Sequence, residues 1–294
     1  MIPLDARKKV RQLQFMARRA VHELLGGEYH SAFKGTGIAF DEVRPYQPGD
    51  DVRGIDWNVT ARMDAPFVKR YIEERERTVV LVLDASASLD FGTGSCTKRD
   101  AAAEVAALLA FSALANNDRI GLLLSSDRIE RFVPPIKGQR HALRIIRDIL
   151  FFRPQHRGTS LAQGLDHLNR VLPRRAIVFL LSDFLDRDFE RPLKRTAQRH
   201  ELIAVHLSDP REHTLPCAGL VHLADAETGR RLLVNTTSPA LSAGYRTHAV
   251  QRTERLKRIT RGAGIDLVEV STDGEHIETL IRFFRSRRTR KGPA

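Results

Sequence analysis

The chain has few of the residues that build disulfide scaffolds or aromatic binding surfaces. Among its 294 residues are two cysteines, one tryptophan and four tyrosines. Cys96 and Cys217 are isolated and far apart in the sequence, so we expect two free thiols, and neither a disulfide framework nor a thiolate metal site is indicated. The shortage of Trp and Tyr also leaves no apparent platform on which single-stranded bases could stack.

Long apolar runs are missing as well. The longest weakly polar stretch, Val105–Leu114, is far shorter than the roughly 20 residues needed to span a membrane. The first residues, Met1–Asp5, contain no apolar core of a secretory signal peptide. We therefore expect a cytoplasmic protein that does not insert into membranes.

Several enzyme motifs are absent from the sequence. It contains no Gly-x-x-x-x-Gly-Lys phosphate loop, no His-Glu-x-x-His zinc motif and no Gly-x-Ser-x-Gly nucleophile elbow. The eleven histidines are scattered. These absences favour a protein that binds a partner over one that catalyses a reaction.

Positive charge, in contrast, is in excess. The chain has 48 Lys and Arg residues against 36 Asp and Glu, which gives a formal net charge of +12 and a pI near 10.3. The basic residues concentrate at Arg252–Arg261 and in the tail, at Arg282, Arg285, Arg287, Arg288, Arg290 and Lys291. Such an excess favours acidic partners, which can be nucleic acid, an anionic membrane surface or an acidic protein face.

The most informative stretch is 78–88, Thr-Val-Val-Leu-Val-Leu-Asp-Ala-Ser-Ala-Ser. Its apolar run, Val79–Leu83, is too short for a helix and rich in β-branched residues, which predicts a strand buried on both faces. Asp84, Ser86 and Ser88 follow at a spacing of two, at the end of the strand where α/β proteins place their ligands. Carboxylate and hydroxyl oxygens in that place suit Mg²⁺. Alternatively, Asp84 or one of the serines simply caps the next helix.

Two later stretches can bring further oxygen ligands to the same edge of the sheet. Thr159, within Gly-Thr-Ser at 158–160, precedes an amphipathic segment and is expected at a helix N-terminus, and Asp183 follows a second buried strand at 176–181. Together these residues resemble the metal-ion-dependent adhesion site of von Willebrand factor A domains, with Asp84, Ser86, Ser88, Thr159 and Asp183 in the five ligand positions. The resemblance implies one bound Mg²⁺ or Mn²⁺, whose open position takes an acidic side chain of a partner.

The N-terminal part carries a second resemblance. Residues 4–25 are expected to form an amphipathic helix that docks on the fold and ends at Gly26-Gly27. The segment 31–77 interleaves opposite charges, which is more typical of a turn-rich ion-pair network than of catalytic carboxylates. It resembles the bacterial family called domain of unknown function fifty-eight, through a Ser-x-x-x-Gly-x-Gly segment, an Arg-x-Tyr-x-x-Gly-Asp-Asp-x-Arg-x-Ile-Asp-Trp run and a Val-Lys pair. The matching residues are Ser31, Gly35, Gly37, Phe40, Arg44, Tyr46, Gly49, Asp50, Asp51, Arg53, Ile55, Asp56, Trp57, Ala61, Arg62, Val68 and Lys69.

After this segment the sequence predicts strands that alternate with helices, and therefore a mostly parallel sheet. We predict a von Willebrand factor A-like, doubly wound α/β fold with one antiparallel edge strand at 129–133, together with a small N-terminal helix and a turn-rich segment. The predicted division is 1–77 for the helix and signature segment, 78–288 for the A-like domain with a hairpin inserted near 219–235, and 289–294 for a disordered tail.

The family resemblance also implies a partner, because similar proteins are typically encoded beside AAA+ ATPases of the MoxR type and are thought to act with them in chaperone-like maturation or remodelling. We therefore predict a non-enzymatic, Mg²⁺-dependent adaptor between such an ATPase and a client protein. One alternative is a nucleic-acid-binding protein that uses Arg252–Arg261 and the basic tail. A metal-dependent phosphohydrolase built on Asp84 and Asp183 is a further alternative, although such enzymes usually place more carboxylates around the metal.

Overall fold

The described residues of the chain fall into two compact units. The computed structural model describes residues 4–21, 29, 32–33, 39–63, 65–72 and 76–291. The larger unit comprises Met1–Ala32 and Arg77–Ala294, and the smaller unit comprises Phe33–Glu76. No helix among the described residues has both the length and the apolar character that crossing a membrane requires.

The larger unit is built on a six-stranded sheet with the strand order β10-β7-β6-β3-β4-β5. In that order the strands are Asp266–Ser271, Glu201–Ser208, Ile177–Ser182, Thr78–Asp84, Arg119–Ser125 and Ile129–Ile136. Five strands run parallel, and β5 pairs antiparallel with β4 at one edge. The predicted α/β class, with a mostly parallel sheet and an antiparallel edge strand, is confirmed.

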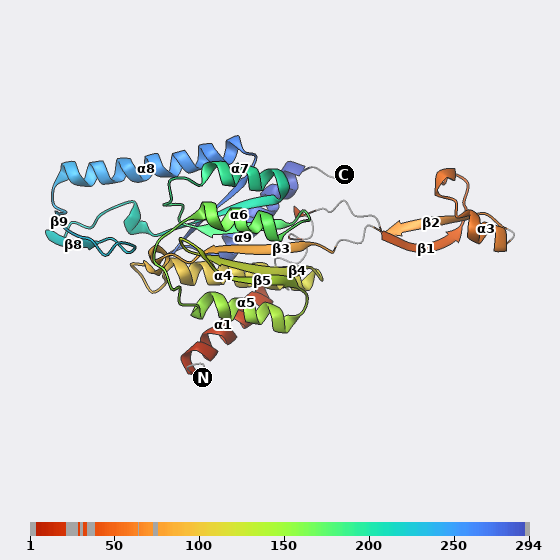
Figure 1. Cartoon of the computed structure of the whole chain (residues 1–294), viewed down its shortest axis with the longest axis horizontal. Coiled ribbons are helices and arrows are strands. Elements are labelled where there is room, and N and C mark those ends of the chain that lie inside the picture. The colour runs from red at the N-terminus through yellow and green to blue at the C-terminus, as the bar shows by residue number, and fades with distance from the viewer. Residues whose placement is uncertain are drawn as a thin grey trace. The chain divides into compact units, whose positions relative to one another are not determined.

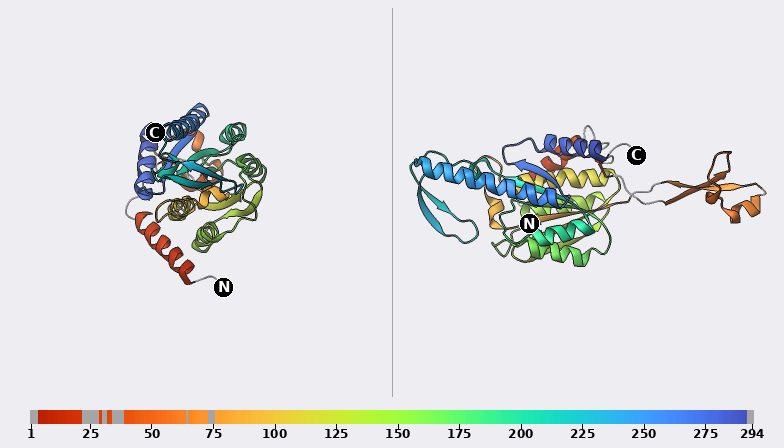
Figure 2. Two further views of the ribbon diagram at one scale, coloured as in Figure 1. Left: turned by 90° about the vertical axis from the view of Figure 1, so that its left-hand side faces the viewer. Right: turned by 90° about the horizontal axis from the view of Figure 1, so that it is seen from above.

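Helices cover both faces of this sheet (Figures 1 and 2). The helices are α1 (Leu4–Ala20), α4 (Lys98–Ala115), α5 (Gln139–Phe151), α6 (Leu161–Val171), α7 (Glu190–Arg199), α8 (Pro239–Gly262) and α9 (His276–Lys291). Val80 and Val82 of β3 pack in one apolar cluster with residues of α6, α7 and the C-terminal part of α8. The intervening residues of β3 are equally buried, under α4 and its neighbours on the other face. The continuous apolar run of β3 follows from this double cover.

Helix α4 is the central helix of its layer, and its start is fixed by a capping box. The Thr97 hydroxyl accepts a hydrogen bond from the Asp100 amide at 3.1 Å, and the Asp100 carboxylate accepts one from the Thr97 amide at 3.1 Å. These reciprocal bonds satisfy two amides that a helix terminus leaves without partners. They also make Lys98 the first residue of the helix, where its ammonium contacts Asp183, the residue after β6.

The N-terminal helix α1 belongs to the larger unit and not with the segment that follows it in the sequence. Leu13 and Ala17 are buried, and α1 packs on α4 and α5. Its apolar stripe is therefore a docking face, and the unit boundary falls after Ala32 because the helix is held by the sheet domain. The predicted helix end at Gly26-Gly27 lies outside the described residues.

The smaller unit contains more regular structure than the sequence predicts. Strands β1 (Ala39–Pro45) and β2 (Phe67–Ile72) form an antiparallel ribbon, and a 3₁₀ turn, η2 (Val52–Gly54), and a short helix, α3 (Trp57–Met63), lie between them in the chain. The expected ion pairs are present at Arg44–Asp50, 2.7 Å, and Lys69–Asp56, 3.4 Å. Hydrogen bonds from Arg44 hold the pKa of Asp50 below its ordinary value. The signature residues Ser31, Gly35 and Gly37 lie outside the described part of the chain.

Strands β8 (Leu220–Ala224) and β9 (Arg231–Asn235) form a separate antiparallel hairpin within the larger unit. The hairpin lies beyond the edge at which the parallel strands end, beside the start of α8 (Figure 1). At the C-terminus, α9 continues to Lys291, further than the boundary predicted at residue 288. Arg287 and Arg290 both pair with Asp266, at 2.9 and 3.2 Å, and these contacts hold the last turns of α9 against the start of β10.

Gly164 lets α6 approach the end of β4, and this contact yields a stability prediction. A Cβ atom at position 164 would lie 2.6 Å from the Oγ of the buried Ser125 and 3.2 Å from its Cβ. We expect Gly164→Ala to lower the free energy of unfolding by about 1–3 kcal/mol, measured by urea denaturation. Adding Ser125→Ala removes the closest atom and should recover part of the loss. A loss that Ser125→Ala leaves unchanged would contradict the proposed clash.

Candidate metal centre

The candidate site begins where β3 ends. Asp84 is buried, and both of its oxygens accept hydrogen bonds. Oδ1 accepts from the Ser86 amide at 2.9 Å, and Oδ2 accepts from the Ser182 hydroxyl at 2.8 Å. Ser182 is the last residue of β6, the strand next to β3. The two neighbouring strand ends are thus joined through the Asp84 carboxylate.

The hydroxyls of Ser86 and Ser88 lie side by side in the loop after β3. A single 3₁₀ turn, η3 (Ala87–Asp90), brings their Oγ atoms to 3.0 Å from each other. Adjacent oxygen ligands of an octahedral ion with metal–oxygen distances of 2.0–2.1 Å are about 2.9 Å apart. The spacing of the two hydroxyls therefore fits two neighbouring ligand positions of Mg²⁺, and both residues are buried next to Asp84.

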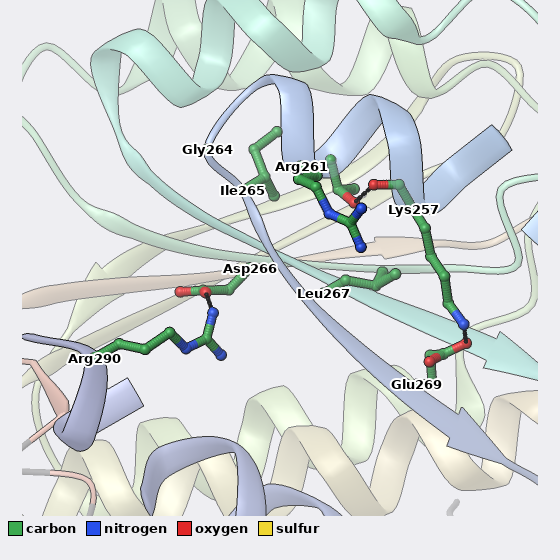
Figure 3. A pocket seen from close by; sticks show the side chains of 9 residues that line it. Lys257, Arg261, Gly264, Ile265, Asp266, Leu267, Glu269 and Arg290 are labelled. Atoms are coloured by element: carbon green, nitrogen blue, oxygen red, sulfur yellow. Dashed lines mark hydrogen bonds and ion pairs between the residues drawn. The ribbon is translucent and has the colours of Figure 1, made fainter. Parts of the chain in front are cut away.

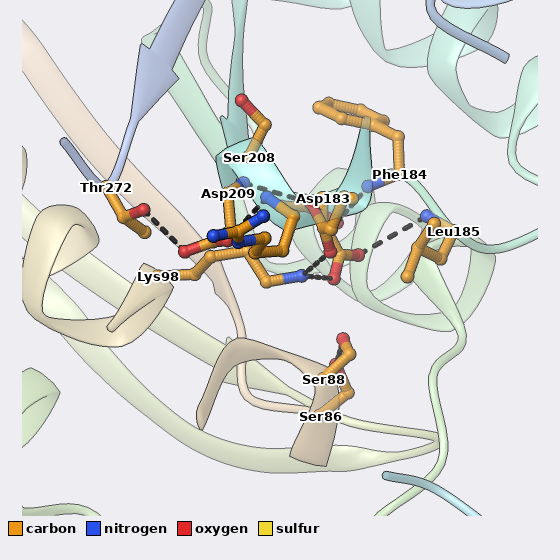
Figure 4. Close-up of polar contacts among 12 residues, drawn as sticks. Ser86, Ser88, Lys98, Asp183, Phe184, Leu185, Ser208, Asp209 and Thr272 are labelled. Carbon is orange, nitrogen blue, oxygen red and sulfur yellow. Dashed lines mark hydrogen bonds and ion pairs between the residues drawn. The ribbon is translucent and has the colours of Figure 1, made fainter. Parts of the chain in front are cut away.

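Asp183 is held by a lysine that the sequence reasoning did not single out. The Lys98 ammonium donates to Asp183 Oδ2 and to Glu212 Oε1, at 2.6 Å in each case. The side chains of Lys98 and Asp183 are both 1% exposed. Figure 4 shows Lys98 and Asp183 pointing toward one another, with Ser86 and Ser88 below them in the view.

The charge on Lys98 depends on these carboxylates. Burial disfavours an ammonium, and so does the N-terminus of α4, where the helix dipole is positive. Asp183 and Glu212 outweigh both effects and raise the pKa of Lys98 above its ordinary value. Lys98 is therefore the internal countercharge of the site.

The two aspartates interact unfavourably with each other. Burial, together with the charge of Asp183, raises the pKa of Asp84 to about 7. Burial also lowers the pKa of the adjacent His206 to about 4, so its imidazole is neutral at pH 7. The site thus combines excess carboxylate charge with a neutral histidine beside it, an arrangement that a divalent cation would stabilise.

The backbone after Asp183 is in an uncommon conformation. Phe184 has φ = 53°, in the left-handed region that residues with a side chain rarely adopt. Hydrogen bonds hold it there, because the Phe184 amide donates to Ser182 Oγ at 3.0 Å and the Leu185 amide donates to Asp183 Oδ1 at 3.3 Å. The turn fixes the orientation of the Asp183 carboxylate at the end of β6.

Thr159 lies near the other predicted ligands but has a different partner. The loop before α6 is anchored beside the first loop, because the Ala87 amide donates to the Arg157 carbonyl at 3.1 Å. Thr159 itself donates through its hydroxyl to Glu227, at the tip of the β8–β9 hairpin. The expectation that Thr159 occupies the helix N-terminus is off by one residue, since Ser160 is the cap of α6 and its Oγ accepts from the Gln163 amide.

A cavity of about 360 Å³ opens next to these residues. Its lining comes from four regions far apart in the sequence and comprises Ser88, Phe91, Lys98, Leu185, Glu212, Asp225, Ala226 and Glu227. In the described part of the chain no three His, Cys, Asp or Glu side chains form a metal-binding group. A cation here would therefore be held by Asp84 and Asp183 together with the serine and threonine hydroxyls. That donor set is hard and oxygen-based, which suits Mg²⁺.

Sequence reasoning missed Lys98, Ser182, Glu212 and Glu227. Glu212 belongs to a short 3₁₀ turn, η4 (Pro210–Glu212), and Glu227 to a hairpin turn. Glu212 and Glu227 could have been singled out only by their positions, after a predicted strand and within a predicted hairpin. Many charged surface residues have such positions, so the sequence does not mark these two as part of a site.

Comparison with known proteins identifies the family. Residues 42–255 match the model of the family described as protein of unknown function DUF58. The chain belongs to the DUF58 family. The family expected from the signature segment is thereby confirmed.

Relatives of this DUF58 protein include uncharacterized proteins of mycobacteria. It is 37% identical over 284 residues to the uncharacterized protein Rv1480 of Mycobacterium tuberculosis, covering 95% of this chain and 89% of the relative. The same identity and coverage hold for the uncharacterized protein Mb1516 of Mycobacterium bovis.

Among solved structures, the conserved hypothetical protein BatB from Bacteroides thetaiotaomicron aligns with a TM-score of 0.47 and 15% identity over 73% of this chain and 99% of that one. An aerotolerance-related membrane protein from Bacteroides fragilis aligns with a TM-score of 0.46 and 11% identity, over 73% of this chain and 99% of that one.

Proposed function

We propose that this DUF58 protein is a non-enzymatic, Mg²⁺-dependent protein-interaction module with a von Willebrand factor A-like fold. The observation that carries the proposal is the grouping of two buried aspartates with two serine hydroxyls at an octahedral spacing, Ser86 Oγ to Ser88 Oγ 3.0 Å. Asp84, Ser86, Ser88 and Asp183 would hold the ion, and Thr159, whose hydroxyl donates its proton to Glu227, would complete the set through the lone pairs of its oxygen. Mn²⁺ would serve in the same position. We place this activity in the cytoplasm.

The bound cation would supply a Lewis-acidic position for a carboxylate of a partner. The chain's own residues prepare that position. Lys98 offsets part of the negative charge of Asp183 and Glu212, and the hydroxyls of Ser86 and Ser88 add no negative charge. Because Asp84 and Asp183 would be the two carboxylate ligands and Lys98 offsets part of the charge around them, an incoming Asp or Glu would gain more from the ion than it would beside a site with more carboxylate ligands.

A groove beside the crevice supports an acidic partner. It has a volume of about 380 Å³ and begins at Phe184 and Leu185, directly after Asp183. Its apolar floor includes Leu256, and Arg252 and Arg255 of α8 also line it. A segment that places one carboxylate at the crevice could lay further acidic and apolar residues along this groove. We propose that such a segment belongs to a MoxR-type AAA+ ATPase or to its client, and that the module links the two during chaperone-like remodelling.

A hydrolase is less well supported by the same geometry. The Ser86 and Ser88 hydroxyls engage each other at 3.0 Å, and Asp183 is paired with Lys98 at 2.6 Å. Metal-dependent phosphohydrolases hold and activate their ions with more carboxylates than Asp84 and Asp183 provide. We therefore propose binding without catalysis.

The nucleic-acid alternative rests on the basic C-terminal surface. A cavity of about 430 Å³ between the end of α8, β10 and α9 is lined by Lys257, Arg261 and Arg290 (Figure 3). Two of these basic side chains are already in ion pairs, Lys257 with Glu269 at 3.2 Å and Arg290 with Asp266 at 3.2 Å. Ion pairing reduces the charge that this surface offers to phosphates, so it favours the adaptor over a nucleic-acid-binding protein.

The first experiment is calorimetric titration of Mg²⁺ and Mn²⁺ into metal-free protein. We expect one ion to bind, and Asp183→Ala to abolish binding, whereas Asp188→Ala, which removes an exposed aspartate beyond the same strand, should bind as the wild type does. Because Asp183→Ala also removes one of the two carboxylates that hold the buried Lys98, Ser88→Ala serves as a second variant and should weaken binding by about tenfold, the effect of roughly 1.4 kcal/mol. Equal binding by all four proteins would refute the assignment.

The partner is tested by co-purification with the cognate MoxR-type ATPase. We expect association in Mg²⁺, loss of association in EDTA or on Asp183→Ala, and modest dependence on salt. Affinity for DNA or RNA that falls steeply with salt and ignores EDTA would support the nucleic-acid alternative instead.

A further inference from the structure

The tip of the β8–β9 hairpin reaches the candidate metal crevice. Glu227 accepts a hydrogen bond from the hydroxyl of Thr159, a residue 68 positions earlier in the chain. Glu227 also lines the cavity that contains Ser88, Lys98 and Glu212. A carboxylate of the chain's own hairpin therefore lies at the crevice where the proposed function places a partner's carboxylate.

The hairpin turn presents Glu227 specifically. The neighbouring Asp225 is used within the turn, because its Oδ1 accepts from the amides of Glu227 at 3.0 Å and Thr228 at 2.7 Å. Gly229, with φ = 70°, closes the turn through a bond from its amide to the Asp225 carbonyl at 2.9 Å. With Asp225 occupied, Glu227 is the acidic side chain of the tip that contacts the crevice residue Thr159.

The rest of the hairpin is weakly packed. Val234 is the buried residue of its two strands, whereas Leu220, Leu232 and Leu233 are 69, 65 and 53% exposed. Elements with few buried apolar contacts open locally at low free-energy cost. The contact between Glu227 and Thr159 can therefore be broken without disturbing the sheet.

The strength of the contact between Glu227 and the crevice depends on the charges around it. Asp183 and Glu212 share one buried cation, Lys98, and the charge of Asp183 also acts on Asp84. Glu227 adds a further negative charge to the cavity that Lys98 and Glu212 line. Without a divalent ion this addition is repulsive, and with one it is attractive. A partner's carboxylate would likewise be repelled by the crevice without a divalent ion and attracted to it with one.

We propose that Glu227 takes the carboxylate position of the crevice in the absence of a partner, so that the hairpin and an acidic ligand compete for it. This inference rests on the proposed function. It assigns Glu227 two opposite effects: its carboxylate strengthens binding of the cation and weakens binding of an acidic ligand.

The test compares wild type with Glu227→Gln, with Glu278→Gln as a control that removes an exposed glutamate on α9. In calorimetric titrations we expect Glu227→Gln to bind Mg²⁺ about tenfold more weakly, because one carboxylate ligand becomes an amide. The EDTA-sensitive part of binding to a fluorescein-labelled hexaglutamate peptide, followed by anisotropy at saturating Mg²⁺, should increase about tenfold in the same variant. Glu278→Gln should change neither quantity.

Amide hydrogen exchange gives an independent readout on the hairpin itself. Mg²⁺ should slow exchange across 219–235 in the wild type and in Glu278→Gln, and should leave it unchanged in Glu227→Gln. If Mg²⁺ binds and Asp183→Ala abolishes binding, but Glu227→Gln resembles the wild type in all three measurements, the hairpin inference is wrong and the proposed function stands. If no protein binds Mg²⁺, both are wrong.

Discussion

Replacing Lys98 with methionine should lower the free energy of unfolding of the metal-free protein by about 3–5 kcal/mol. The Lys98 ammonium lies 2.6 Å from both Asp183 Oδ2 and Glu212 Oε1, and its side chain is 1% exposed. Methionine keeps most of the length and apolar contact of the lysine stem while removing its charge. The variant would leave the buried Asp183 beside Asp84 with no countercharge, which is the situation in which a broken buried ion pair is most destabilising.

Mg²⁺ should restore much of this loss if it binds between the same carboxylates. We expect saturating Mg²⁺ to raise the thermal midpoint of Lys98→Met by several degrees more than that of the wild type. Lys194→Met is the matched control, because Lys194 pairs with Glu190 on the exposed face of α7 and its loss should change stability by less than about 0.5 kcal/mol. Equal losses in the two variants, measured by urea denaturation, would mean that Lys98 is not the countercharge of the site.

The layered fold could be predicted because its signals are local. The apolar run Val79–Leu83 lies within the observed strand Thr78–Asp84, and helix α4, Lys98–Ala115, is a continuous stretch rich in Ala and Leu. Both segments are buried nearly all round, so their composition is decided by the core. The order of strands in the sheet is set by crossovers between distant segments, and no local pattern encodes it.

The β1–β2 ribbon was not predicted, because its sequence lacks such a local signal. Its first strand, Ala-Phe-Asp-Glu-Val-Arg-Pro at 39–45, mixes charged and apolar residues without a clean alternation, and a bulge shifts its register between Phe40 and Glu42. Of the β2 side chains that the structure describes, those of residues 67–69, Val68 is the buried one. With little core to fill, the sequence of the ribbon carries little of the period-two pattern by which strands are recognised.

Within the candidate site, the sequence spacing predicted the residues of the loop after β3 but not the residues that pack against Asp183. Asp84, Ser86 and Ser88 stand together in the sequence, whereas Lys98 meets Asp183 and Glu212 across 85 and 114 residues. At the start of a helix a lysine is usually a solvated surface residue, and only the packed structure shows that this one is buried. The burial of Lys98 beside these carboxylates therefore follows from the fold, and no sequence motif predicts it.

Binding of Mg²⁺ should release a proton below neutral pH. Burial and the charge of Asp183 raise the pKa of Asp84 from 3.8 to about 7 in the metal-free protein. Between pH 3.8 and about 7 the Asp84 carboxyl is mostly protonated in the folded protein and mostly ionised in the unfolded chain. Stability of the metal-free protein therefore falls as the pH rises from about 4 to 7, by up to about 1.4 kcal/mol per pH unit, and no further loss from Asp84 is expected above that window.

A cation held by Asp84 requires the carboxylate form, so its affinity should depend on pH in the opposite direction. We expect the association constant for Mg²⁺ to rise about tenfold per pH unit below 7 and to level off above it. Calorimetry in two buffers of different ionisation enthalpy should show close to one proton released per ion near pH 6 and almost none near pH 8.5.

Ser182→Ala provides the matched variant for this linkage. The Ser182 hydroxyl donates to Asp84 Oδ2 at 2.8 Å and favours its ionised form, so removing it should raise the pKa of Asp84 further. Proton release would then persist to higher pH than in the wild type. Affinity that is independent of pH between about 5.5 and 8.5 in both proteins would place the ion away from Asp84 and would count against a metal centre at the end of β3.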